Sequence, residues 1–142
     1  MEQPYKNQAT GTIITKSWEE NTWDGQPWNE VSGAKLTKAS VTTTFQGDIE
    51  GESNEAWLMV YRSDTSADFV GLEQVTGQLA GRSGSFVLQH SGTYDNGKLH
   101  SSCLVVPGSG SGELTGLRGE GRYVFDGQHG DPTRYTLAYD FD

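Results

Sequence analysis

A five-residue unit, glycine-x-(isoleucine or leucine)-x-glycine, occurs three times along the chain, at residues 47–51, 77–81 and 112–116. Each copy precedes a short apolar segment, at 56–61, 85–90 and 122–125. The alternate glycines of one unit fall on one face of a strand, where a missing side chain lets a neighbouring backbone or ring approach closely. Glycine also adopts the positive φ that tight turns and bulges require. The repeat therefore predicts a series of β-hairpins.

The rest of the chain also has the pattern of an antiparallel β protein. No window combines a helical period with caps, and short β-rich runs alternate with clusters of Gly, Asn, Asp and Ser. Nineteen glycines suit tight turns and the kinks that a barrel needs at its corners. We predict one all-β domain, 1–142, folded as a closed antiparallel β-barrel of about eight strands. The strands are expected near 9–18, 38–50, 55–62, 68–80, 84–94, 98–106, 118–125 and 134–141.

One stretch, 19–34, does not fit the strand pattern. Trp23, Pro27 and Trp28 lie there among polar residues, and Trp18 precedes them. We expect an ordered loop or a turn of helix that lays tryptophans over one end of the domain.

The two faces of each strand can be separated because successive side chains point to opposite sides. If Arg82 and Ser83 form a two-residue loop, the more apolar face of the hairpin 68–94 is the interior, with Phe69, Gly71, Glu73, Val75, Leu79, Phe86, Leu88, His90 and Tyr94. The same procedure places inside Val41, Thr43, Phe45, Ile49, Ala56, Leu58, Val60, Gly121, Tyr123, Phe125, Tyr135, Leu137, Tyr139 and Phe141. Strand 98–106 stays undecided because both of its faces are mixed.

This assignment turns Trp57, Met59 and Tyr61 outward together. Aromatic residues and methionine are enriched in interface cores, so we expect a homo-oligomer that uses this row. The alternative is that the tryptophan-rich stretch covers the row within one chain.

Glu73 and His90 form the most informative polar pair, because both are assigned to the interior of one hairpin. A carboxylate in an apolar interior has a raised pKa, and a nearby imidazole can share its proton, so the pair is a candidate for general acid–base catalysis. The alternative is a structural pair that ties two strands together. Candidate ligand-binding residues share the same interior: Thr43, Phe69, Phe86, Tyr123, Tyr135 and Tyr139. Their alternative role is ordinary core packing.

Charge and cysteine content argue against several classes of function. The formal net charge is −9, which disfavours binding to nucleic acids and to anionic membranes. The single cysteine, Cys103, excludes an intrachain disulfide, and the first ten residues hold no apolar signal segment, so we expect a cytoplasmic protein.

Motifs for metal, nucleotide and serine-nucleophile chemistry are missing from the sequence. The three histidines, His90, His100 and His129, have no metal-ligand spacing. There is no P-loop and no G-x-S-x-G motif. We therefore expect neither a metal site nor a cofactor.

Long motifs of the chain resemble a known family. They are Phe69–Gly77, Gly81–His90, Val106–Leu114 and Gly116–Gly121. In this order they are similar to a family of small bacterial proteins catalogued as domain of unknown function 3224, over residues 8–142. The resemblance implies an eight-stranded barrel like that of allene oxide cyclase, and oligomerisation. It implies no activity. Allene oxide cyclase closes an unstable fatty-acid epoxide inside its barrel, but that is an analogy at the level of fold.

Three functions remain open from the sequence. The first is a barrel that binds an apolar or amphipathic small molecule in its interior, with isomerase or cyclase activity through Glu73 and His90. The second is a non-catalytic carrier of the same kind of ligand. The third is an interaction module with a solid core, since eight strands enclose just enough room for side chains.

Overall fold

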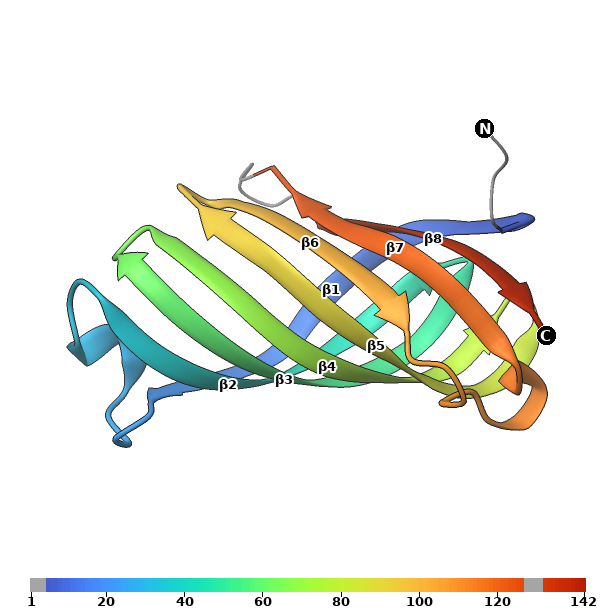
Figure 1. Ribbon diagram of the computed structural model, residues 1–142, viewed down its shortest axis with the longest axis horizontal. Helices are drawn as coiled ribbons and strands as arrows, with labels where there is room; N and C mark the ends of the chain where they lie inside the picture. Colours follow the sequence, from blue (N-terminus) through green and yellow to red (C-terminus); the bar gives the residue numbers. More distant parts are fainter. Residues whose placement is uncertain (1–4, 127–131) are drawn as a thin grey trace.

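The computed structural model describes residues 5–126 and 132–142 of the chain (Figure 1). In this part of the chain, eight antiparallel strands close into a barrel, each pairing with the next and the last with the first. The strands are β1 (Asn7–Thr22), β2 (Lys35–Gly47), β3 (Ile49–Ser63), β4 (Ser66–Leu79), β5 (Arg82–Asp95), β6 (Lys98–Val105), β7 (Leu117–Phe125) and β8 (Thr133–Phe141). Two short 3₁₀ helices follow β1 and β6: η1 (Trp28–Glu30) and η2 (Gly112–Leu114). The predicted fold class is confirmed.

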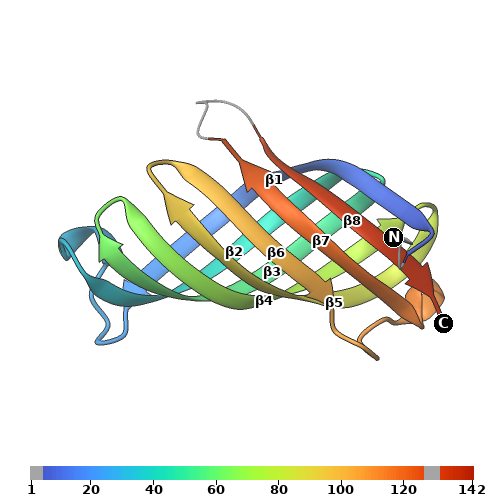
Figure 2. The same cartoon turned by 45° about the horizontal axis from the view of Figure 1, so that its top comes forward.

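The barrel is elongated and has two different ends (Figures 1 and 2). At one, called here the open end, lie the β1–β2, β3–β4 and β5–β6 connections. At the other, the closed end, lie the β2–β3, β4–β5 and β6–β7 connections. No helix among the described residues is long and apolar enough to cross a membrane.

Glycines of the repeated unit meet across neighbouring strands near the closed end. Gly51 of the first copy pairs with Gly77 of the second, and Gly77 pairs in turn with Gly84. A Cβ atom on Gly77 would lie 2.1 Å from the carbonyl oxygen of Glu50, a distance that no side chain tolerates. The repeat therefore lets adjacent strands approach closely where the sheet curves to close the barrel.

The β4–β5 turn differs from the prediction. Its two residues are Ala80 and Gly81, with φ of 50° and 84°, and not Arg82 and Ser83. Two positive φ angles are what the favoured two-residue hairpin turn requires, and glycine satisfies the second at no steric cost. The turn thus lies two residues earlier than predicted, and each residue of β4 pairs with a β5 residue four positions away from its predicted partner. An even shift leaves the faces unchanged, so the predicted interior face of this hairpin is confirmed, with Glu73 and His90 buried.

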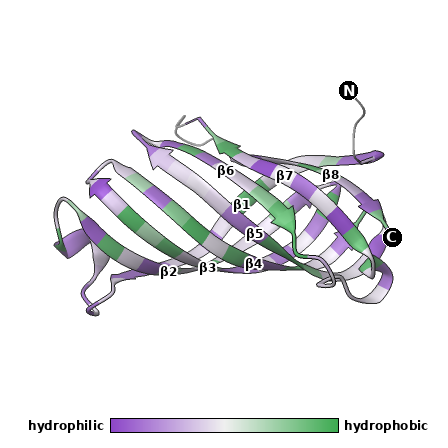
Figure 3. Cartoon of the chain, viewed as in Figure 1, coloured by the Kyte–Doolittle hydropathy of each residue, from purple (hydrophilic) through white to green (hydrophobic). Residues whose placement is uncertain are grey.

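The assignment of the β3 faces was wrong. Leu58 and Val60, predicted inside with Ala56, are exposed on the outer surface, at 46% and 43%. Trp57, Met59 and Tyr61 point inward and are buried, so they do not form an outward interface. The reason is that β3 runs without a break from Ile49 to Ser63, and its period of two keeps the parity of the buried Ile49. Figure 3 shows how bands of high and low hydropathy follow one another along the strands of the barrel. Homo-oligomerisation remains a prediction, but Trp57, Met59 and Tyr61 cannot form its interface.

The interior is divided along the barrel axis. The half toward the closed end is filled by apolar side chains that form one continuous core, among them Phe45, Leu79, Phe86, Leu114 and Leu137. The half toward the open end holds a smaller cluster around Trp57, Met59, Tyr61 and Phe69. β1 extends to Thr22, through the start of the stretch expected to be a loop. Trp28 of η1 stacks on Tyr61 with ring centroids 6.5 Å apart, which is the predicted covering of one end by tryptophan.

Candidate functional site

A cavity of about 500 Å³ occupies the half of the barrel toward the open end. Aromatic and aliphatic side chains form most of its wall, and polar side chains from β2, β3, β6 and β7 also reach it: Thr43, Glu55, Ser101 and Tyr123. Of the predicted ligand-binding residues, Thr43, Phe69 and Tyr123 line the cavity. Phe86, Tyr135 and Tyr139 instead lie in the packed core of the closed half.

Glu73 and His90 contact each other directly, with 2.8 Å between Glu73 Oε1 and His90 Nε2. Both side chains are fully buried. Neither one lines the cavity, but each bonds to a residue that does. The Tyr123 hydroxyl donates to Glu73 Oε1 at 2.6 Å, and Ser101 Oγ lies 3.0 Å from His90 Nδ1. The pair therefore lies one residue behind the cavity wall.

Ser101, His90 and Glu73 form a continuous hydrogen-bonded chain that begins at the cavity. When Glu73 is ionised it is an acceptor only, so His90 Nε2 donates to it and Nδ1 accepts from the Ser101 hydroxyl. The Ser101 proton can then move to the imidazole, whose positive charge Glu73 stabilises. Ser101 could not be assigned to the interior from the sequence, because both faces of the strand 98–106 carry a mixture of polar and apolar residues. Its pairing with Gly92 across β5 and β6 places it inside.

The second carboxylate oxygen of Glu73, Oε2, is hydrogen-bonded as well. Ser53 Oγ donates to Glu73 Oε2 at 2.6 Å and lies 2.5 Å from Thr43 Oγ1. Burial, and then the negative charge of Glu73, hold the pKa of Tyr123 well above its usual range, so the phenol remains a hydrogen-bond donor. The carboxylate of Glu73 thus accepts hydrogen bonds from three side chains on three other strands.

Glu55 is a second buried carboxyl group, and it faces the cavity directly. Its Oε1 atom has no hydrogen-bond partner among the described residues. Burial, followed by the charge of neighbouring Glu73, raises the pKa of Glu55 to about 9, against smaller lowering effects of Trp57 and Thr43. At neutral pH Glu55 is therefore an uncharged acid that can donate a proton or a hydrogen bond. Continuing the period of two from Ile49 along β3 would have identified it.

A third carboxyl group, that of Glu20, lines the cavity near the open end. Its Oε2 accepts from Thr37 Oγ1 at 2.6 Å and from the Tyr61 hydroxyl at 2.7 Å, and its Oε1 accepts from Trp18 Nε1 at 3.0 Å. Burial and the interactions with Glu20 raise the pKa of Tyr61, which keeps its proton on the phenol. Glu20 could not be assigned to the interior from the sequence, because 19–34 was expected to be a loop.

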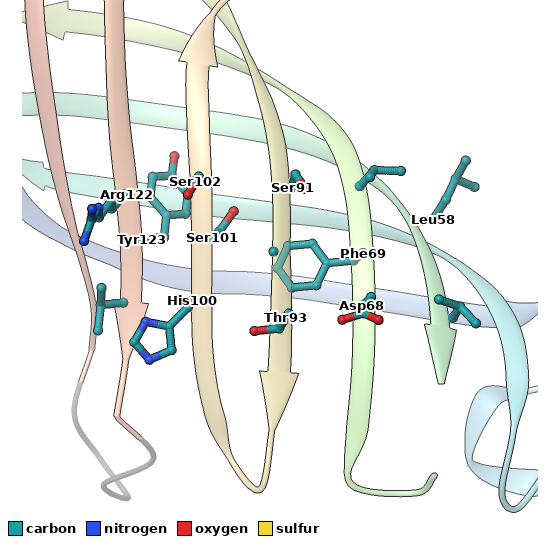
Figure 4. A pocket seen from close by; sticks show the side chains of 14 residues that line it. Leu58, Asp68, Phe69, Ser91, Thr93, His100, Ser101, Ser102, Arg122 and Tyr123 are labelled. Atoms are coloured by element: carbon teal, nitrogen blue, oxygen red, sulfur yellow. The ribbon is translucent and has the colours of Figure 1, made fainter. Parts of the chain in front are cut away.

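The wall of the barrel also carries a depression that opens to the outside (Figure 4). Outer residues of β3 to β7 surround it, including Leu58, Asp68, His100 and Arg122, while Tyr123 reaches it from the interior. Among the described residues, its outer rim brings together no buried titratable groups comparable to those inside, so we place the candidate site in the interior cavity.

Metal chemistry has no support from the described residues, which contain no group of three or more His, Cys, Asp or Glu able to hold an ion. His129 lies outside the residues that the structure describes. Cys103 is buried, and burial followed by the charge of Glu73 raises its pKa to about 12, so it remains an unreactive thiol.

Fold and site together define a class: closed eight-stranded antiparallel β-barrels with an internal cavity and a buried polar network at its base. The chain belongs to the DUF3224 family, described as proteins of unknown function, whose sequence model matches residues 9–139.

Similar barrels occur among solved structures. The crystal structure of a DUF3224 protein from Shewanella oneidensis MR-1 is 31% identical, with a TM-score of 0.76, and the match covers 96% of this chain and 98% of that one. Pyocyanin demethylase shares the fold at 11% identity and a TM-score of 0.64, over 94% of this chain and all of the other. Among proteins with curated descriptions, none matches the chain.

Proposed function

We propose that this protein binds an apolar or amphipathic small molecule inside the open half of its barrel. The observation that carries the proposal is the cavity itself, about 500 Å³ with an aromatic wall and a few polar groups at its base. Ligand sites in proteins have this size and this combination of apolar lining with a small number of placed polar groups. A solid-core interaction module would need the same space to be filled by side chains.

A larger side chain in the cavity wall is expected to block the ligand. Val41 is 3% exposed and lines the cavity, so Val41→Phe projects a ring into the space that the ligand needs. We expect the affinity for the neutral fluorescent probe N-phenyl-1-naphthylamine, measured by fluorescence titration, to fall by about tenfold or more.

The matched control is Val70→Phe, which adds the same ring to an outer position of β4 that is 52% exposed. It should bind the probe as the unsubstituted chain does, and thermal unfolding should show that both variants are folded. Equal binding by Val41→Phe and the unsubstituted chain would place the probe elsewhere and contradict the proposal.

Acid–base catalysis is the second candidate function. The hydrogen-bonded chain from Ser101 through His90 to Glu73 favours it, since it connects a cavity-facing hydroxyl to a buried base. In this scheme Ser101 Oγ takes a proton from the carbon next to a ligand carbonyl, while its own proton passes to His90. Glu55 donates a hydrogen bond to the carbonyl oxygen and so stabilises the negative charge of the enolate that forms. Glu73 and His90 act through Ser101 as positioning and proton-accepting residues. The name pyocyanin demethylase, borne by a neighbour of this fold, supports testing for an enzymatic role.

Proton transfer can be tested with 1-acetonaphthone, an apolar ketone that carries exchangeable hydrogens. In D₂O we expect the protein to accelerate deuterium incorporation next to the carbonyl, measured by NMR, and Ser101→Ala to lower this acceleration by about 100-fold or more. Ser102→Ala, on the adjacent outer position of β6, serves as the control. If the protein binds the ketone but deuterium exchange is no faster than in buffer, the catalytic proposal is contradicted and the carrier function stands.

A further inference from the structure

Among the acidic and basic side chains of the described residues, only carboxylic acids line the cavity. Glu20, Glu55 and Asp64 line it, whereas no lysine, arginine or histidine does so among the described residues. The molecule as a whole carries a formal net charge of −9. An anionic ligand would therefore meet repulsion both on approach and inside the cavity, while a cation would be attracted at both stages.

Glu20 supplies the charge near the open end. Its three hydrogen-bond donors among the described residues, from Trp18, Thr37 and Tyr61, are uncharged groups. Because these donors serve both of its oxygens, the Glu20 carboxylate is held as an acceptor, and no cation among the described residues forms an ion pair with it. A positively charged group on a ligand in the cavity could therefore form an ion pair with Glu20.

Glu55 supplies a second, different polar group. Its side chain is more than nine-tenths buried, it lines the cavity, and its Oε1 atom lacks a partner among the described residues. A buried polar atom without a partner costs free energy, and a ligand that bonds to it would recover that cost. Glu73 lies beside it on β4, and the Tyr123 phenol on β7 faces the same cavity. A hydrogen-bond donor or a basic nitrogen on the ligand could therefore bond to these carboxyl and hydroxyl groups.

The aromatic wall is suited to the same kind of ligand. Trp57 and Phe69 contact edge to face, with ring centroids 5.0 Å apart, and both line the cavity. Aromatic faces attract cations through their quadrupole. The molecule already uses this attraction at the open end, where the ammonium of Lys35 lies 4.8 Å from the Tyr61 ring centroid. That ammonium donates hydrogen bonds to the carbonyl oxygens of Trp28 and Val31.

We propose that the ligand of this cavity is an apolar, ring-containing molecule that carries one positively charged nitrogen, and that Glu20 selects for that charge. The inference rests on the proposed binding function and adds the class of ligand to it. It excludes carboxylate ligands such as fatty acids as preferred occupants.

Three ligands with the same naphthalene body test the charge preference at pH 7: 1-naphthylmethylamine, 1-naphthalenemethanol and 1-naphthaleneacetate. Their affinities are measured by displacement of N-phenyl-1-naphthylamine from the unsubstituted protein. We expect the amine, which is protonated at this pH, to bind about tenfold more tightly than the alcohol, and the carboxylate to bind about tenfold more weakly than the alcohol.

Two isosteric variants identify the group responsible. Glu20→Gln should lower the affinity for the amine by about tenfold and leave that for the alcohol unchanged. Glu19→Gln removes the same charge from the neighbouring exposed position of β1 and should change neither affinity.

The outcomes separate the two proposals. If the amine and the alcohol bind equally, or if Glu19→Gln acts as strongly as Glu20→Gln, the selection by Glu20 is refuted while cavity binding stands. If neither the fluorescent probe nor any of the three ligands binds, the proposed function itself fails.

Discussion

The Glu55→Gln variant is expected to become progressively more stable than the unsubstituted chain as the pH rises, by on the order of 4 kcal/mol between pH 5 and pH 8. The physical reason is the pKa of Glu55, which burial and the charge of Glu73 raise to about 9 in the folded state. Glutamine keeps the shape and polarity of the protonated acid but cannot ionise.

The sign follows from the protons bound in each state. Between pH 5 and pH 8 the folded protein keeps the Glu55 proton, whereas the unfolded chain, whose Glu55 has the ordinary pKa of 4.5, has lost it. Because the unfolded state then binds fewer protons, the free energy of unfolding falls by about 1.4 kcal/mol per pH unit. The stabilisation by protonated Glu55 is complete below the unfolded pKa and is lost as the pH rises through the folded pKa.

Urea unfolding at pH 5, 6, 7 and 8 measures this difference, and subtracting the two curves removes the contribution of groups that titrate alike in both chains. Glu50→Gln, at an exposed position of the same strand, is the control and should show no such trend. A constant difference between the Glu55→Gln variant and the unsubstituted chain would mean that Glu55 is ionised in the folded protein, with a pKa near its usual value.

Glu73→Ala is expected to lower the free energy of unfolding by about 3–5 kcal/mol at pH 7. The substitution removes the acceptor of Tyr123, His90 and Ser53, which are all buried, so three buried polar groups lose a partner at once. Gln74→Ala, at the next and outward-facing position of β4, should cost much less. A loss of less than about 1 kcal/mol for Glu73→Ala would show that the network reorganises without it.

Glu73→Gln provides a more specific measurement, because it removes the charge and keeps the size. The negative charge of Glu73 is the second cause of the raised pKa of Glu55, so in this variant that pKa should fall toward its usual value. The fall in the free energy of unfolding that Glu55 causes should therefore stop at a lower pH than in the unsubstituted chain. An unchanged profile would mean that burial alone sets the pKa of Glu55.

Alternation within a strand was readable wherever a strand has one apolar face. The alternation correctly predicted that Phe69, Glu73 and His90 face the interior of the barrel from β4 and β5. The two-residue error in the position of the turn did not matter, because an even shift leaves each side chain on the same face of its strand. The alternation failed on β3, where Trp57, Met59 and Tyr61 alternate with Leu58 and Val60, so that both faces are apolar. It was undecided on β6, where Ser101 lies inside.

The sequence by itself determined the barrel, because repeated glycines, period-two alternation and turn residues are local signals that each strand carries independently. It also determined that Glu73 and His90 face the interior. Only the tertiary structure decided that the interior is packed at one end and hollow at the other, since that depends on side chains from all eight strands meeting across the axis. The same closure brings Glu20, Glu55 and Ser101, from three separate strands, to one cavity whose wall carries acids without a compensating base among the described residues.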